Sequence, residues 1–247
     1  MIRRPPRSTQ GVSSAASDVY KRQVAILYNF PSNPTGGTLN EQQRDDLLAF
    51  AKKHDLWIIS DEVYDRIVFE EDHVSFMGTG YDKLMVVNSF SKTFAMTGWR
   101  IGYIISTNLE AMKQVVKIQY YISACSNDAM QYAVLEAMEK ANDYPSEMAS
   151  EFQKRCHLIV DRLNAMPGVQ CHRPKGAIYV FPKVDVPGMS SEEVALELLK
   201  DGVLCSPGSA FGPSGEGHLR FAYTISQDDI SRGMDKVEAT LRRLQKA

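Results

Sequence analysis

The chain has 247 residues, of which 44% are hydrophobic and 23% are charged, and its formal net charge is -2. This composition is ordinary for a globular protein, and charges of both signs are interspersed, so neither nucleic acid nor an anionic membrane surface is indicated as a partner. No apolar run approaches the roughly 18 residues that cross a bilayer, so we also expect no membrane partner.

The cysteines and histidines show no pattern of a disulfide framework or a zinc site. Both residue types are scattered at irregular spacing along the chain, and the four cysteines are Cys125, Cys156, Cys171 and Cys205. Regular spacing would be expected for disulfide-rich or zinc-binding folds. We therefore expect reduced cysteines, no metal and a cytoplasmic location.

Residues 1–23 differ from everything that follows. Their only acidic residue is Asp18, they contain Pro5-Pro6, and their basic residues are Arg3, Arg4, Arg7, Lys21 and Arg22. A segment without a hydrophobic period cannot bury enough surface to offset its ordering entropy. A disordered tail and a transit peptide both fit this composition, and the segment also resembles a non-native peptide translated from sequencing-adaptor DNA. We favour the non-native peptide, because ordinary sequence begins abruptly at Val24 inside a predicted strand.

Strands and helices alternate between residues 24 and 145. Short apolar runs predict strands at 24–28, 56–60, 84–88 and 101–105, and helical spacing predicts helices at 39–54, 112–121 and 127–140. Thr38 and Glu41 have the spacing of a capping box at the start of the first helix. The alternation predicts an α/β domain with a mainly parallel sheet.

The pattern changes after residue 145. Helices are predicted at 146–165, 191–201 and 227–244, and short strands at 169–172, 177–181, 203–206 and 218–223. The first two of these strands are expected to pair through the turn at 173–176. Because this α+β arrangement has its own apolar positions, we predict a second, smaller domain over 146–247.

One lysine and two serines follow the third predicted strand. Ser89 and Ser91 are two residues apart and can face the same side, and Lys92 follows at the strand tip, where open α/β sheets bind ligands. Two hydroxyls and the nearby guanidinium of Arg100 suit a phosphate, and a lone lysine suits a Schiff base, which together indicate pyridoxal phosphate (PLP). A solvated lysine beside turn-forming serines fits this stretch alone equally well.

Polar residues at other predicted strand ends could complete such a site. Asp61 could keep a pyridine nitrogen protonated, or it could cap a helix. Tyr64 could lie on the same face of a helical turn as Asp61, or it could be a half-buried packing residue. Asn33, in an Asn-Pro-Thr-Gly sequence, could donate to the cofactor's ring oxygen or form a plain turn. Arg220 lies between apolar residues of a predicted strand, where it could reach a substrate carboxylate or sit at an edge.

Five motifs taken in order resemble the class I and II aminotransferases of PLP fold type I. They are NPTG at 33–36, SDEVY at 60–64, SFSK at 89–92, GWRIGY at 98–103 and LRFAY at 219–223. The resemblance runs over residues 24–247. It implies that 24–145 is the C-terminal part of a PLP-binding large domain and that 146–247 is the small domain. It also implies transfer of an amino group between an amino acid and a 2-oxo acid, in a homodimer.

The resemblance implies a role for each candidate residue. Lys92 would attach PLP and move a proton, and Asp61 would pair with the pyridinium nitrogen. Tyr64 and Asn33 would contact the ring oxygen of the cofactor. Arg220 would bind the substrate α-carboxylate, and Asn33 would lie near that carboxylate as well. The phosphate would be held by Ser89, Ser91 and Arg100.

Aminotransferases of this family begin well before the strand predicted at 24–28. We therefore expect the chain to be an incomplete fragment that binds PLP poorly and turns over little. The same motifs also fit a PLP-dependent β-lyase, an effector-sensing domain of a transcription regulator, or an inert fragment. A regulator would need an N-terminal DNA-binding module, for which residues 1–23 are too short.

Overall fold

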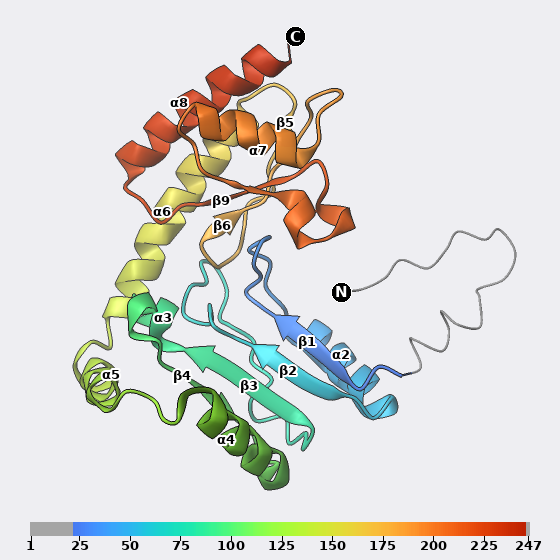
Figure 1. Ribbon diagram of the computed structural model, residues 1–247, viewed down its shortest axis with the longest axis vertical. Helices are drawn as coiled ribbons and strands as arrows, with labels where there is room; N and C mark the ends of the chain where they lie inside the picture. Colours follow the sequence, from blue (N-terminus) through green and yellow to red (C-terminus); the bar gives the residue numbers. More distant parts are fainter. Residues whose placement is uncertain (1–21, 246–247) are drawn as a thin grey trace, which may run out of the picture.

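A computed structural model describes residues 22–245, so nearly all of the predicted non-native segment lies outside the described residues. Four strands form one sheet in the order of the chain, β1 (Ala25–Asn29), β2 (Trp57–Asp61), β3 (Leu84–Ser89) and β4 (Gly102–Ile105) (Figure 1). The first three are parallel, and β4 runs antiparallel to β3. The prediction of a mainly parallel sheet is confirmed, with an antiparallel strand beside β3.

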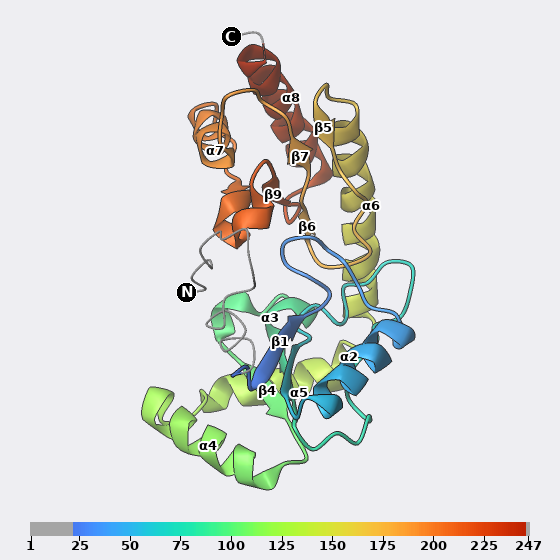
Figure 2. The same ribbon diagram turned by 90° about the vertical axis from the view of Figure 1, so that its right-hand side faces the viewer.

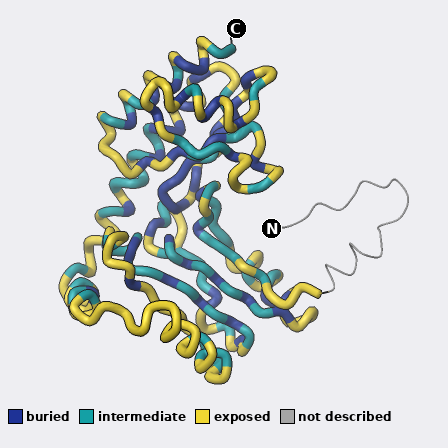
Figure 3. The backbone as a smooth tube through the Cα atoms, in the orientation of Figure 1, coloured by how far each residue is buried: buried dark blue, intermediate teal, exposed yellow. Residues whose placement is uncertain are grey.

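Three helices accompany this sheet, α2 (Glu41–Lys53), α4 (Leu109–Ser123) and α5 (Asp128–Lys140). The helix α2 lies on one side of the sheet and α4 on the other (Figure 2). The side chains of Leu48 and Ala51 on α2 are buried in one core cluster with Ile58 of β2. In contrast, α4 buries no residue, and Figure 3 shows it almost wholly exposed.

The predicted cap of α2 was wrong. Asn40 is the N-cap, where its side chain accepts from the Gln43 backbone N–H at 2.8 Å and the Gln43 side chain accepts from the Asn40 N–H at 3.0 Å. Thr38 and Glu41 have the same spacing two residues earlier. Asparagine is a stronger N-cap than threonine, and Asn40 caps the helix that begins at Glu41.

The long helices of the C-terminal part are α6 (Tyr144–Asn164), α7 (Ser191–Lys200) and α8 (Gln227–Leu244), close to the predicted ranges. Its strands are shorter than predicted. They form one sheet in the order β6 (Tyr179–Val180), β9 (Leu219–Ala222) and β8 (Ser206–Pro207), and a separate pair of β5 (Val169–Gln170) and β7 (Lys183–Val184). Short helical turns, which the sequence did not predict, are α3 (Phe90–Thr93), η1 (Thr97–Trp99), η2 (Gly208–Phe211) and η3 (Pro213–Gly215).

The expected hairpin between 169–172 and 177–181 does not form. The connecting turn is instead bound to the N-terminal part, because the N–H groups of Lys175 and Gly176 both donate to the Gly36 carbonyl at 3.0 Å. The Phe69 N–H also donates to the Lys175 carbonyl at 3.0 Å. These bonds keep the segments before and after the turn from pairing with each other, so β6 pairs with β9 and β5 pairs with β7.

The segment after β2 joins the two parts of the molecule. Tyr64 and Ile67 belong to the core cluster that α6 and α8 also supply. The Ala177 N–H donates to the Ile67 carbonyl at 2.9 Å, and Val68 forms an isolated bridge with Gly176. The domain boundary near residue 145 stays a prediction, and α6 begins at Tyr144.

Candidate active site

Lys92 lies in α3, directly after β3. Ser89 is the N-cap of this turn, and its Oγ accepts from the Ser91 N–H at 3.1 Å. The hydroxyl oxygens of Ser89 and Ser91 are 2.8 Å apart, and Ser89 Oγ also donates to the Ile101 carbonyl at 3.0 Å. The two hydroxyls therefore lie together, as their spacing predicted, although Ser91 occupies a helical turn rather than the strand.

A cavity of about 340 Å³ opens beside Lys92. Its volume lies within the range of small-molecule sites, roughly 300–1,000 Å³. The cavity is lined by Asp61, Val63, Val87, Asn88, Ser89, Ser91, Lys92, Thr97 and Arg100. Five residues singled out from the sequence thus surround one cavity: Asp61, Ser89, Ser91, Lys92 and Arg100.

Two left-handed residues bring Arg100 back to the end of β3. Ala95 has a φ of 54° and Arg100 a φ of 57°. Between them, Thr97 Oγ1 donates to the Ser91 carbonyl at 3.0 Å, and Arg100 Nη1 donates to the Thr97 carbonyl at 2.8 Å. Non-glycine residues in this conformation are uncommon and tend to occur at ligand sites. No local sequence signal distinguishes Ala95 as one of them.

Asp61 is the last residue of β2 and places a carboxyl in the cavity wall. Burial raises the pKa of this carboxyl, while the Val63 N–H, 3.3 Å from its Oδ1, and the Asn29 side chain act in the opposite direction. A cationic group in the cavity would favour the ionised carboxylate, which burial disfavours.

The other three predicted residues, Asn33, Tyr64 and Arg220, do not line this cavity. Arg220 bridges the two parts of the molecule, since its Nη1 donates to Asn33 Oδ1 and its Nη2 donates to Ser206 Oγ, both at 2.9 Å. The guanidinium lies 4.6 Å from the ring centroid of Tyr179 and 5.0 Å from that of Phe211. Contacts of this kind stabilise a cation between aromatic faces.

Asn29 positions Asn33 and was not predicted. Its Oδ1 accepts from the Asn33 N–H at 2.9 Å, and its Nδ2 donates to the Asp61 carbonyl at 3.3 Å. One side chain therefore ties the turn after β1 to the end of β2. Asparagine at a strand end is typical of an ordinary turn, so no local pattern distinguished Asn29.

Tyr64 lies at the junction of the two groups. Its hydroxyl is 2.9 Å from that of Tyr179, and Lys92 Nζ is 5.8 Å from its ring centroid. Burial and the hydrogen bond with Tyr179 raise the pKa of Tyr64, so its hydroxyl stays protonated. Tyr179 was missed because it stands in the run Ala-Ile-Tyr-Val-Phe, where a tyrosine looks like any core residue.

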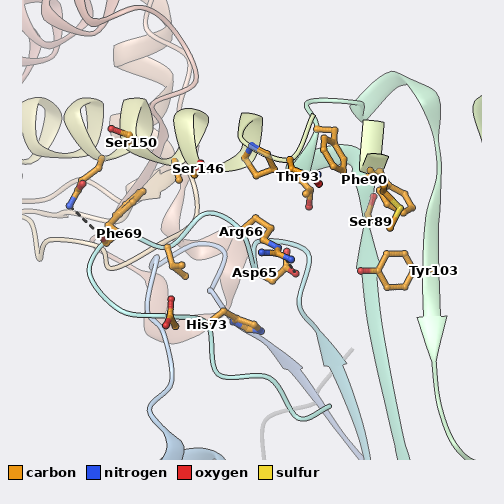
Figure 4. A pocket seen from close by; sticks show the side chains of 18 residues that line it. Asp65, Arg66, Phe69, His73, Ser89, Phe90, Thr93, Tyr103, Ser146 and Ser150 are labelled. Carbon is orange, nitrogen blue, oxygen red and sulfur yellow. Dashed lines mark hydrogen bonds and ion pairs between the residues drawn. The ribbon is translucent and has the colours of Figure 1, made fainter. Parts of the chain in front are cut away.

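A larger cavity of about 800 Å³ lies beside the first, and Ser89 lines both. Figure 4 shows its wall, with His73 and Asp65 from the segment after β2, Tyr103 from β4 and Ser146 from α6. His73 Nε2 lies 2.9 Å from Oε2 of the buried Glu62.

Residues 22–245 show neither a metal cluster nor a membrane-spanning helix. No three His, Cys, Asp or Glu side chains there gather in a way that could hold a metal ion. No helix in that range is both long enough and apolar enough to span a membrane.

A family model described as aminotransferase class I and II matches residues 9–237. The chain belongs to this family. It is 36% identical over 230 residues to an aspartate aminotransferase of Pyrococcus abyssi, a match that covers 91% of this chain and 59% of the relative. It is 39% identical over 216 residues to an aspartate aminotransferase of Thermotoga maritima, covering 87% of this chain and 55% of the relative.

Solved structures of aminotransferases share the fold. An aromatic aminotransferase from Pyrococcus horikoshii superposes with a TM-score of 0.85 at 33% identity, covering 94% of this chain and 64% of that one. The aspartate aminotransferase of Thermus thermophilus with maleate gives 0.83 at 29% identity, covering 89% and 57%. The family and the fold expected from the motifs are confirmed. This aminotransferase-family chain spans 54% to 62% of the length of its curated relatives.

Proposed function

We propose that this protein transfers an amino group between an amino acid and a 2-oxo acid, with PLP as cofactor. The observation that carries the proposal is the cavity beside Lys92, which is lined by an amine, a carboxyl and side chains whose donors suit a phosphate. Membership of the aminotransferase family supports it. Relatives named as aspartate and aromatic-amino-acid aminotransferases support the same reaction class.

The residues around the cavity fit PLP by their chemistry. The hydroxyls of Ser89 and Ser91 lie 2.8 Å apart, and Arg100 lines the same cavity, a donor set that suits a phosphate. The partly buried Asp61 carboxyl suits the cationic ring nitrogen. Lys92 lies in the same wall and supplies the amine.

When bound, PLP supplies an aldehyde that takes up amino groups and a ring that spreads the negative charge left at the substrate Cα. Lys92 Nζ would hold the cofactor between turnovers and then move the proton at Cα. Asp61 would stay ionised against the ring nitrogen. Tyr64, whose hydroxyl contacts that of Tyr179, and Asn33, whose N–H donates to Asn29, would contact the ring oxygen.

Arg220 is our candidate for binding the substrate α-carboxylate. Its planar fork holds two side-chain oxygens, of Asn33 and Ser206, at 2.9 Å each. A carboxylate also presents two oxygens and matches this fork better than separate neutral acceptors do. Asn33, already in contact with Arg220, would then lie between the carboxylate and the cofactor.

We further propose that the protein forms a homodimer and works in the cytoplasm. Large apolar side chains exposed on α4, among them Tyr120, Tyr121 and Ile122, support an association surface. The thiol of Cys125 is free and exposed, which suits a reducing compartment. Light scattering on the purified protein tests the dimer, and a monomer at all concentrations would contradict it.

Borohydride reduction tests the cofactor and its attachment point. The chain is incubated with PLP, reduced and digested, and the labelled peptide is mapped by mass spectrometry. We expect the label on Lys92, its loss in Lys92→Ala, and its retention in Lys113→Ala, which alters an exposed lysine of α4. Equal labelling of the Lys92→Ala chain would refute the assignment.

A second assay tests the reaction. Aspartate or an aromatic amino acid is supplied with and without 2-oxoglutarate, and the oxo-acid product is measured. Amino transfer requires the acceptor. Product that forms equally without an acceptor would point to eliminating chemistry on the same cofactor.

A further inference from the structure

We propose that Tyr179 is a positioning residue, which fixes the hydroxyl of Tyr64 for its contact with the cofactor. The inference rests on the proposed function, since the contact that it serves is the one between Tyr64 and the PLP ring oxygen.

The two tyrosine hydroxyls form a buried pair across the two parts of the chain. They lie 2.9 Å apart, and the rings meet edge to face with centroids 5.9 Å apart. The exposed fraction is 4% for Tyr64 and 9% for Tyr179. Each hydroxyl has one proton, so in this pair one tyrosine donates and the other accepts.

The register of the small sheet places the Arg220 guanidinium nearer to the Tyr179 ring than the Lys92 amine is to the Tyr64 ring. Tyr179 pairs with Ala222 across β6 and β9, so Arg220, two residues earlier on β9, is its diagonal neighbour on the same face. The Arg220 guanidinium lies 4.6 Å from the Tyr179 ring centroid. A cation at a phenol ring makes its hydroxyl the better donor, so Tyr179 donates and Tyr64 accepts.

This direction leaves the Tyr64 proton available to a second acceptor. Burial raises the pKa of Tyr64, so the proton is retained. Lys92 Nζ lies 5.8 Å from the Tyr64 ring centroid, which places the proposed attachment point of the cofactor beside this tyrosine. Tyr179 therefore acts through Tyr64 and needs no contact with the cofactor itself.

A double-mutant cycle on the cofactor-free chain tests the pair. Tyr64→Phe and Tyr179→Phe each leave one buried hydroxyl without its partner, whereas the double variant removes both. We expect the urea midpoint of the double variant to lie above that of either single variant. Tyr28→Phe is the matched control, because the buried Tyr28 hydroxyl has no hydrogen-bond partner among the described residues, and its midpoint should not fall. Additive losses from the two single variants would overturn the proposal.

PLP affinity, measured from the absorbance of the bound cofactor, tests the role toward the cofactor. Tyr179→Phe should weaken PLP binding by about three- to tenfold, the value of one hydrogen bond, when Tyr64 is present. It should have no effect in the Tyr64→Phe chain. An equal loss in both backgrounds, or no loss in either, would refute this inference alone. PLP binding to this incomplete chain is expected to be weak, so the refuting result is its complete absence: no borohydride label on the unmodified chain even at high PLP concentration would refute the proposed function and, with it, the cofactor role of Tyr179.

Discussion

The buried carboxylate of Glu62 is expected to stabilise the end of β2, and replacing it tests how the site is held. Glu62 directly follows Asp61 and is only 4% exposed. Its Oε1 accepts from Ser60 Oγ at 2.8 Å and from the Phe76 N–H at 3.2 Å, and its Oε2 lies 2.9 Å from His73 Nε2. The Glu62 side chain thus connects His73 and Phe76, in the segment after β2, to Ser60 in the strand that carries Asp61.

The cost of Glu62→Gln follows from these contacts. The amide oxygen can still accept from Ser60 and Phe76, but each bond changes from charge-assisted to neutral, a loss of about 1 kcal/mol per bond. A neutral side chain is cheaper to bury, which offsets part of this loss. We expect a net loss of about 1–2 kcal/mol in the free energy of unfolding at pH 7. Glu62→Ala, which leaves all three donors without their partner, should cost about 3–5 kcal/mol.

The effect should depend on pH in a defined direction. Burial raises the pKa of Glu62, but hydrogen bonds from His73, Ser75, Ser60 and the Phe76 N–H outweigh it and leave the pKa below the usual 4.5. A carboxyl whose pKa is lower in the folded state stabilises above its unfolded pKa and loses that contribution as the pH falls through the folded pKa. The stability gap between the unmodified chain and Glu62→Gln should therefore narrow below about pH 4.5.

Urea unfolding followed by tryptophan fluorescence measures these differences, and Trp57, in β2 itself, is a suitable probe. Glu238→Gln is the control, because the exposed pair of Glu238 with Arg242, at 2.7 Å, should contribute less than about 0.5 kcal/mol. A Glu62→Gln chain that is as stable as the unmodified chain at pH 7 would contradict the expected loss. A stability gap that is the same at pH 7 and well below pH 4.5 would contradict the expected pH dependence.

Three other substitutions test the site and the backbone around it. Asp61→Asn should lower amino transfer by about 10²–10³-fold while borohydride labelling of the attachment lysine persists, because only the charge against the ring nitrogen is lost; an unchanged rate would remove this residue from the mechanism. Arg220→Lys should raise the KM for both substrates by about tenfold, since an ammonium cannot replace the fork, with PLP affinity unaffected. Gly36→Ala should destabilise more than Gly78→Ala, although both have positive φ, because a Cβ at Gly36 would lie 2.4 Å from the Pro174 Cβ and one at Gly78 meets nothing within 4 Å. Equal urea midpoints for the two alanine variants would contradict this steric argument.

Features set by local spacing could be predicted from the sequence. The helix α8 occupies the predicted range, because its apolar period and its Ser226 N-cap are both local signals. The five predicted residues that line the cavity beside Lys92 were also indicated by local signals. Four of them, Ser89, Ser91, Lys92 and Arg100, lie within twelve consecutive residues, and Asp61 ends the neighbouring strand.

Features set by distant partners could not be predicted. The pairing of β6 with β9 depends on the turn at Lys175 binding Gly36, which lies far away in the sequence. Tyr179 and Ser206 gain their importance only from contacts with Tyr64 and Arg220. In sequence they resemble a core tyrosine and a turn serine, so no property of either residue type marks them.

The segment after β2 has a consequence for how the chain could be divided. Tyr64 and Ile67 pack in the core that α6 and α8 form, and the Ala177 N–H is bonded to the Ile67 carbonyl. A fragment starting at α6 would therefore have an unfilled hole in its centre and an unpaired backbone donor at its edge. The C-terminal half of this chain is completed by residues that are made much earlier in synthesis, so it lacks part of its core when it is separated from the segment after β2.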